Sequence, residues 1–150
     1  VYYGDEAGVC GFTDPDNRRT YPWGKEDKVL IRFHRDMIRI HRENPALRTG
    51  SVKFLRGDRN ILCYARFNRA QQFIIVVNND GYTRSMEIGV CGAGVPSSCQ
   101  MTQIMYSSED NYSMAPVTYQ VERSFQNILL LCCDISQKRT KTTHINTNLI

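Results

Sequence analysis

The chain has 150 residues, of which 41% are hydrophobic and 23% charged, and its formal net charge is +4. This composition predicts a folded chain with room for one ordinary domain, and it excludes a largely disordered protein. No run reaches the roughly 18 apolar residues that a membrane span needs, so no membrane partner is predicted.

The first residues form an apolar, β-branched and aromatic run, which predicts the end of a buried strand at residues 1–4. Because chain ends are usually polar and loosely held, this start predicts that more protein lies upstream. Residues 5–24 are rich in Gly and Pro and predict a long loop. Loops of this length in compact domains are usually functional or disordered.

A helix is predicted from about residue 28 to Glu43, because an apolar stripe recurs at steps of three and four residues. The stripe consists of Leu30, Phe33, Met37 and Ile40. Pro45 biases the residue before it away from helix and so ends the element. The basic residues of this helix are Arg32, Arg35, Arg39 and Arg42, interleaved with Asp36 and Glu43 at pairing distances. A solvated helix face is therefore predicted here, and not a nucleic-acid site.

After Gly50 the apolar period falls to two, and turn residues recur about every ten positions. We expect strands near 52–54, 61–67, 73–77, 83–88, 101–106, 117–121 and 128–133. This spacing predicts a two-layer antiparallel β-sandwich of about six to eight strands. Its core should include Phe73, Ile75, Val77, Leu129 and Leu131. The polar residues from 136 onward predict a mobile tail.

Six cysteines are present, and the interpretation favoured is that they are reduced thiols. Cys63, Cys132 and Cys133 lie in apolar strand-like runs, where Cys acts as a small hydrophobe. The absence of a C-x-x-C pair argues against zinc. Cys91 and Cys99 flank a Gly/Pro/Ser loop and form the one plausible disulfide, which stays open as the minority alternative.

Several short motifs occur in a defined order and resemble the α-amylase family of glycoside hydrolases, nearest to its neopullulanase and cyclomaltodextrinase type. They are Tyr2-Tyr3-Gly4-Asp5-Glu6, Asp14-Pro15-x-x-Arg18, Tyr21-Pro22-Trp23 and Glu43-Asn44-Pro45-Ala46-Leu47-Arg48. The resemblance covers residues 1 to about 80. It implies that residues 1–48 are the last strand, loop and helix of an incomplete (β/α)8 barrel, that 49–135 form the C-terminal β-sandwich domain, and that 136–150 are the tail.

The same resemblance implies where the chemistry lies. Retaining hydrolysis or transfer at α-1,4 or α-1,6 glucosidic bonds needs two carboxylates flanking the scissile bond, and in this family they lie on earlier barrel strands. No catalytic residue, cofactor or metal is therefore expected in this chain. Asp14 and Arg18 match the family's Asp and Arg that contact a donor-side glucose. The alternative is that Asp14 caps a turn before Pro15 and that Arg18 pairs with it.

Other candidate residues receive structural interpretations. Four aromatic side chains could stack on sugar rings, namely Tyr3, Phe12, Tyr21 and Trp23. For Tyr3 and Trp23, packing of the loop against the barrel is favoured. Asp5 and Glu6 are interpreted as structural, bonded to loop backbone or to an Arg outside the chain. His34 and His41 are seven residues apart, which does not suit a metal pair.

The favoured function is the C-terminal portion of an α-glucan-acting glycoside hydrolase, with the sandwich as a structural support and the loop as a substrate contact. The alternative is a non-catalytic carbohydrate-binding or oligomerisation module, for which the aromatic candidates are Tyr64, Tyr82, Tyr106, Tyr112 and Tyr119. The expected partner is an α-glucan or maltooligosaccharide. Self-association through the apolar stripe and a cytoplasmic location are further expectations.

Overall fold

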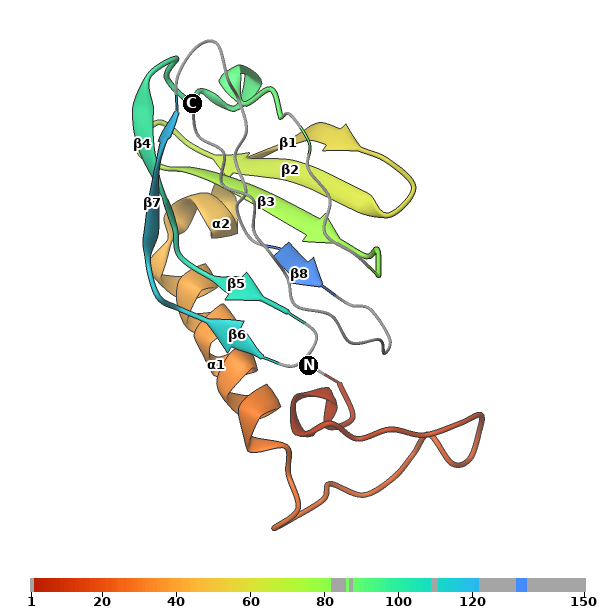
Figure 1. Cartoon of the computed structure of the whole chain (residues 1–150). Helices are drawn as coiled ribbons and strands as arrows, with labels where there is room; N and C mark the ends of the chain where they lie inside the picture. Colours follow the sequence, from red (N-terminus) through yellow and green to blue (C-terminus); the bar gives the residue numbers. More distant parts are fainter. Residues whose placement is uncertain (1, 82–85, 87, 109–110, 122–131, 135–150) are drawn as a thin grey trace. The chain divides into compact units, whose positions relative to one another are not determined.

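The chain divides into two compact units, Val1–Asn44 and Pro45–Ile150. The computed structural model describes residues 2–81, 86, 88–108, 111–121 and 132–134 (Figure 1). Within these residues, no helix is both long enough and apolar enough to cross a membrane.

The first unit holds a short 3₁₀ helix, η1 (Asp5–Ala7), and the long helix α1 (Lys28–Glu43). The structure confirms the predicted helix. Asp27 caps its first turn, because Oδ1 of Asp27 accepts from the backbone N–H groups of Val29 and Leu30, each at 2.9 Å. At the other end Asn44 is extended, with φ −114° and ψ 102°, as expected before a proline. No residue of α1 is buried.

The predicted strand at residues 1–4 is wrong for the residues described. Tyr3 and Gly4 both have positive φ, 49° and 82°, and the Asp5 backbone N–H donates to the Tyr2 carbonyl at 3.1 Å. The chain therefore turns here and enters η1. Residues of high β propensity suggested a strand, but Gly4 takes the left-handed conformation that closes the turn at little cost.

The second unit is mainly β, as predicted, and begins with the short helix α2 (Pro45–Thr49). The strands described are β1 (Ser51–Gly57), β2 (Ile61–Phe67), β3 (Gln72–Asn78), β4 (Cys99–Gln103), β5 (Tyr106–Ser107), β6 (Tyr112–Ser113), β7 (Val117–Val121) and β8 (Cys132–Asp134). One sheet has the order β1-β2-β3-β8-β5-β6, and the other pairs β4 with β7. Most pairings are antiparallel, but β8 runs parallel to both β3 and β5.

The register of β2 and β3 decides which face of the large sheet is buried. Cys63 pairs with Val76 and Ala65 with Ile74, and these four side chains are buried. The buried face of β3 therefore carries Ile74 and Val76. The prediction that Phe73, Ile75 and Val77 fill the core is wrong by one residue, because they lie on the opposite face and are only half-buried. Leu129 and Leu131 lie outside the described residues.

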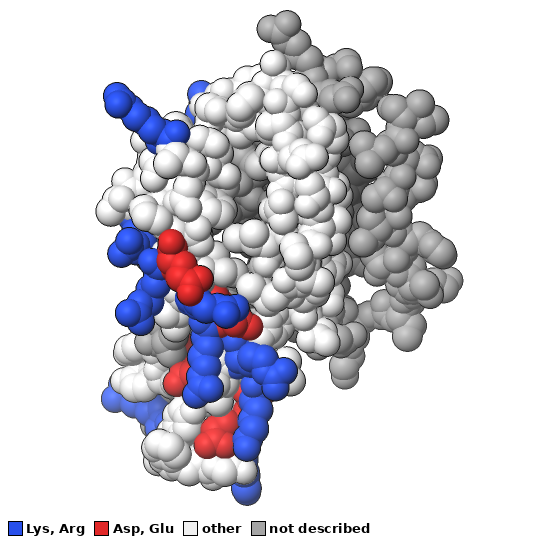
Figure 2. Space-filling model, turned by 90° about the vertical axis from the view of Figure 1, so that its left-hand side faces the viewer, with Lys and Arg blue, Asp and Glu red and all other residues white. Residues whose placement is uncertain are grey.

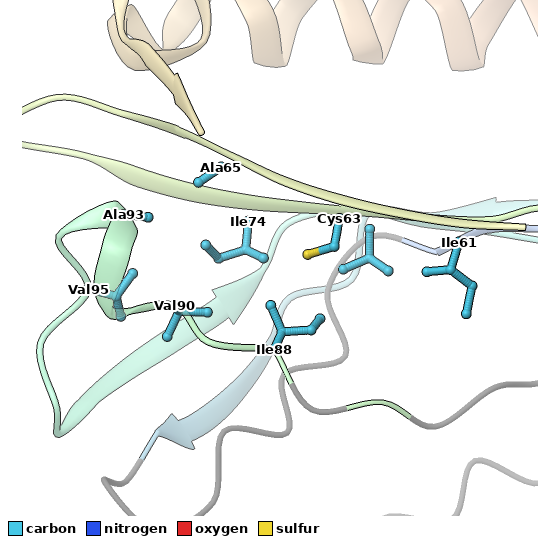
Figure 3. Close-up of a cluster of buried hydrophobic side chains, with 9 residues drawn as sticks. Ile61, Cys63, Ala65, Ile74, Ile88, Val90, Ala93 and Val95 are labelled. Carbon is cyan, nitrogen blue, oxygen red and sulfur yellow. The ribbon is translucent and has the colours of Figure 1, made fainter. Parts of the chain in front are cut away.

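A second layer covers this buried face. Ile88, Val90, Ala93 and Val95 come from the segment around η2 (Cys91–Ala93) and complete a hydrophobic cluster with β2 and β3 (Figure 3). Cys99 and Met101 of β4 and Tyr119 of β7 pack against the same cluster. The large sheet and the smaller sheet thus form the two layers of the predicted sandwich.

Some predictions fall in segments that the structure covers in part. Of the strand expected at 83–88, Met86 and Ile88 are described, and neither is in a strand. Ile88 is instead a buried core residue of an irregular segment. Most of the strand expected at 128–133 and the whole tail from 136 lie outside the described residues.

Four cysteine side chains are described, and all four are free thiols: Cys10, Cys63, Cys91 and Cys99. The minority alternative of a Cys91–Cys99 disulfide is therefore not what the structure contains. Cys63 is completely buried, in agreement with the prediction that it acts as a small hydrophobe. Burial raises the pKa of its thiol to about 11.

Candidate functional site

The loop between η1 and α1 is held at its base by backbone contacts. The Asp27 backbone N–H donates to the Ala7 carbonyl at 3.1 Å, and Ala7 is buried. Gly8 has φ +76° and lies against Asp27 and Leu30, so a larger residue there would be strained. The residue that caps α1 therefore also closes the loop, and residues 8–27 leave and rejoin the unit at one place.

A tight turn shapes the middle of the loop. The Asp16 backbone N–H donates to the Thr13 carbonyl at 3.0 Å, and the Arg18 N–H donates to the Pro15 carbonyl at 3.1 Å. A Cβ on Gly11 would lie 2.7 Å from the Asp16 carbonyl oxygen. Only glycine allows this approach between two backbone segments, so Gly11 fixes where the turn of residues 13–18 lies.

Asp14 and Arg18 meet at this turn, as their spacing allows. Nε of Arg18 donates to Oδ1 of Asp14 and Nη2 donates to Oδ2, each at 3.0 Å. The side chains remain 66% exposed for Arg18 and 60% for Asp14. This bidentate pair leaves further N–H donors on the guanidinium and further lone pairs on the carboxylate for another ligand.

A second ion pair lies beside the first in the same turn. Nη2 of Arg19 donates to both carboxylate oxygens of Asp16 at 2.8 Å. Oδ2 of Asp16 also accepts from the Phe12 backbone N–H at 3.0 Å. The Phe12 N–H, and then Arg19, lower the pKa of the Asp16 carboxyl. Asp16 therefore organises the loop, whereas Asp14 accepts hydrogen bonds from Arg18 alone among the residues described.

A pocket of about 400 Å³ opens on the side of the loop that carries Asp14 and Arg18. Its lining combines aromatic rings, the ion pair and small polar groups, from Tyr2, Tyr3, Asp5, Val9, Cys10, Gly11, Asp14, Asn17 and Arg18. The rings of Tyr2 and Tyr3 lie 4.1 Å apart between centroids and are exposed. A hydrogen bond with Tyr3 is the largest cause that raises the pKa of the Tyr2 hydroxyl.

Packing of Tyr3 and Trp23 against the barrel stays a prediction. In this chain the two side chains are 58% and 80% exposed. Tyr3 lines the pocket. Trp23 instead contacts Tyr21, with ring centroids 4.6 Å apart. Phe12 is 87% exposed and lies outside the pocket lining.

Asp5 and Glu6 have different environments, although they are adjacent. Oδ2 of Asp5 accepts from the Tyr2 backbone N–H at 3.2 Å, which agrees with the predicted bond to loop backbone. Oε2 of Glu6 is buried and has no hydrogen-bond partner among the residues described. Across all the residues that the structure describes, no group of three His, Cys, Asp or Glu side chains is placed to hold a metal ion.

The arrangement suits a neutral polyhydroxylated ligand better than a charged one. A carboxylate accepts hydrogen bonds from hydroxyl groups and a guanidinium donates to hydroxyl oxygens in a fixed fork. The pair has no net charge of its own and presents both functions side by side. The faces of Tyr2 and Tyr3 add an apolar surface with polar edges at the same pocket.

Comparison with known proteins gives partial matches. No family model matches the chain. An amylopullulanase of Thermoanaerobacter thermohydrosulfuricus is 46% identical over 66 residues, which are 44% of this chain and 4% of that protein. A cyclomaltodextrinase of a Bacillus species is 39% identical over 84 residues, which cover 53% of this chain and 15% of that protein. Neopullulanase 2 of Thermoactinomyces vulgaris is 32% identical over 98 residues, which cover 63% of this chain and 17% of that protein. The resemblance to the α-amylase family is confirmed.

The structural comparison supports the fold. The fold is similar to that of the debranching enzyme of Nostoc punctiforme, with a TM-score of 0.56 and 23% identity, over 83% of this chain and 24% of that one. The chain spans less than a fifth of the length of the curated relatives named above. These relatives are α-glucan hydrolases.

Sequence reasoning named four residues of the pocket lining as candidates, Tyr3, Asp5, Asp14 and Arg18, and it missed the other five. These are Tyr2, Val9, Cys10, Gly11 and Asn17. The doubled aromatic of Tyr2 and Tyr3 beside Gly4 was a signal for the first. Cys10 and Asn17 carried no signal, because their placement depends on how the turn of residues 13–18 folds over Gly11.

Proposed function

We propose that this chain is the C-terminal part of an α-glucan-acting glycoside hydrolase and that its loop contacts the substrate through Asp14 and Arg18. The observation that carries the proposal is the exposed bidentate pair at a pocket lined by Tyr2 and Tyr3. The α-glucan hydrolases among its relatives support the substrate class.

An exposed ion pair of this kind contributes only about 0–1 kcal/mol to stability. Folding alone is therefore a weak reason for two charged side chains to be held in this geometry. The neighbouring Asp16–Arg19 pair differs in this respect, because Asp16 also binds the Phe12 backbone and lies outside the pocket lining. Substrate contact accounts for the first pair and loop structure for the second.

The parent enzyme would hydrolyse or transfer α-1,4 or α-1,6 glucosidic bonds with retention, by a carboxylate nucleophile and a carboxylic acid/base. Neither group is assigned to this chain. Asp14 and Arg18 would bind and orient a glucose unit next to the bond that reacts. The β-sandwich unit would serve as a structural support without a catalytic role.

Binding can be tested on the chain itself by NMR titration with maltotriose. We expect saturable shifts of the residue 2–18 amides with a Kd on the order of 1–10 mM, a weak affinity worth roughly 3–4 kcal/mol. Asp14→Asn and Arg18→Gln should each weaken binding, whereas Arg19→Gln should not, because Asp16 still accepts the Phe12 backbone N–H that holds the turn. Equal weakening by all three variants would show that only loop structure matters, and unchanged binding in the first two would refute the contact.

Catalysis offers a second test of the proposal. The chain alone should release no sugar from maltooligosaccharides, because the mechanism needs two carboxylates that it does not supply. Release that survives repurification and disappears in Asp14→Asn would contradict the assignment of this chain as a non-catalytic part.

Self-association is the remaining element of the proposal. No residue of α1 is buried, and Met37 of the stripe formed by Leu30, Phe33, Met37 and Ile40 is 36% exposed. The other three members are half-buried, and exposed apolar patches of about a few hundred Å² are typical of contact surfaces. We expect concentration-dependent association in sedimentation velocity, reduced by Met37→Gln. A strictly monomeric chain at all concentrations would refute it.

A further inference from the structure

The basic residues of α1 form a single line along the helix. Lys28, Arg32, Arg35, Arg39 and Arg42 follow one another at alternating steps of four and three residues. At 3.6 residues per turn this spacing keeps all five on one face, over a length of about 21 Å. All five are exposed, and Figure 2 shows Lys and Arg side chains gathered together, with a few acidic ones among them. We call these five residues the cationic stripe.

Most of the stripe is not neutralised by the ion pairs predicted from the sequence. Nη2 of Arg39 donates to Oδ1 of Asp36 at 2.9 Å, as expected. Among the residues described, no salt bridge is formed by Arg32, Arg35 or Arg42. Three guanidinium groups of the stripe therefore remain available, two before Arg39 and one after it, and each can bind a carboxylate in bidentate geometry.

The two borders of the stripe differ. Asp36 and Glu43 lie on one side, and Ile31 and Ile38 lie on the other, again seven residues apart. Ile38 is 48% exposed and Ile31 is half-buried. Arg35 and Arg42 thus stand next to an apolar pair with the same repeat. In helix pairs, charged residues that flank an apolar seam set partner choice and orientation. Ile31 and Ile38 supply one apolar position per heptad of such a seam, with Arg35 and Arg42 beside it.

We propose that the cationic stripe of α1, together with Ile31 and Ile38, binds an acidic amphipathic helix of a partner protein. The carboxylates of that helix would pair with Arg32, Arg35 and Arg42, and its apolar residues would cover the two isoleucines. This site lies on a different face of α1 from the stripe of Leu30, Phe33, Met37 and Ile40, and it is independent of the sugar pocket.

The geometry disfavours other anionic partners. On a membrane, the main apolar face of α1 would enter the lipid, which would turn the cationic stripe toward water, because the two faces point in nearly opposite directions. A nucleic acid would bind the guanidinium groups but would leave Ile31 and Ile38 uncovered, whereas the apolar residues of an amphipathic helix would cover them. A second copy carries the same stripe and the same net charge of +4.

The test uses the full chain and a fluorescein-labelled peptide of about three Glu-Ile-Ala-Ala-Leu-Glu-Lys heptads, followed by fluorescence anisotropy. We expect saturable binding that weakens as the ionic strength rises from about 0.01 M to 0.15 M. The triple variant Arg32→Gln/Arg35→Gln/Arg42→Gln should bind roughly tenfold more weakly, since each exposed charge pair contributes little by itself. A peptide with Gln in place of Glu should lose binding to a similar degree.

The matched control is Arg48→Gln/Arg59→Gln/Arg69→Gln, which removes the same charge from three exposed residues of the second unit. It should bind the peptide as the unmodified chain does. Equal weakening in both triple variants would show that net charge alone is responsible, and stronger weakening by Met37→Gln would place the peptide on the other face. Tighter binding of a short DNA duplex or of phosphatidylserine vesicles than of the peptide would also overturn the proposal.

Discussion

Replacing two adjacent isoleucines of β3 tests which face of the large sheet is the core. Ile74 is 1% exposed within the hydrophobic cluster, whereas Ile75 is half-buried on the opposite face. Ile74→Ala removes three buried carbons, at about 0.8 kcal/mol each, and leaves a cavity that adds to the loss. We expect Ile74→Ala to lower the free energy of unfolding by about 2–5 kcal/mol.

Ile75→Ala removes the same three carbons from a site that already contacts solvent. We expect a loss of roughly 1 kcal/mol, because the transfer term is smaller and no closed cavity forms. Urea unfolding followed by far-UV circular dichroism measures both variants. Fluorescence would not serve, because the single tryptophan, Trp23, lies in the first unit. Equal losses, or a larger loss for Ile75→Ala, would refute the face assignment.

Three further variants test other parts of the structure. Burial raises the pKa of the Cys63 thiol to about 11 from 9.0. The free energy of unfolding should therefore fall by on the order of 2–3 kcal/mol as the pH rises from 9 to about 11, because the unfolded chain loses this proton first. Cys63→Ala should lack this fall, and identical pH profiles of the two proteins would contradict it. Asp27→Ala should destabilise the first unit by about 0.5–2 kcal/mol through loss of the α1 cap, seen as reduced helicity and earlier melting. Gly11→Ala should abolish maltotriose binding while the β-sandwich keeps its stability, since the added Cβ meets backbone at 2.7 Å; normal binding would show that the turn is not fixed by this approach.

The sequence carried enough information for the elements whose signals are local. The helix of α1 followed from its three- and four-residue period and from Pro45, and β2 and β3 followed from their apolar runs. The sequence could not decide which face of β3 is buried, because Phe73 to Val77 are apolar at every position and their periodicity favours neither face. The parallel partner β8 comes from far along the chain, and no local pattern reports such a pairing.

The site shows the same division between local and distant information. Asp14 and Arg18 were named as site residues because their motif resembles that of the α-amylase family, whereas the contact between them follows from their spacing of four. Tyr3 was named, but its exposure was not foreseen, because the turn at Tyr3 and Gly4 was interpreted as a strand. The pocket itself depends on Gly11 bringing two backbone segments together, which composition does not reveal.

The most direct test of the central claim is the kcat/KM of Arg18→Ala in the intact enzyme that this chain is proposed to complete. Loss of a charged hydrogen bond to the sugar should cost about 1.5–3 kcal/mol of transition-state binding, a fall of roughly 10- to 150-fold, with melting unchanged. An enzyme that melts earlier yet keeps normal kinetics once folded would contradict the account, because Arg18 would then only stabilise the loop through Asp14.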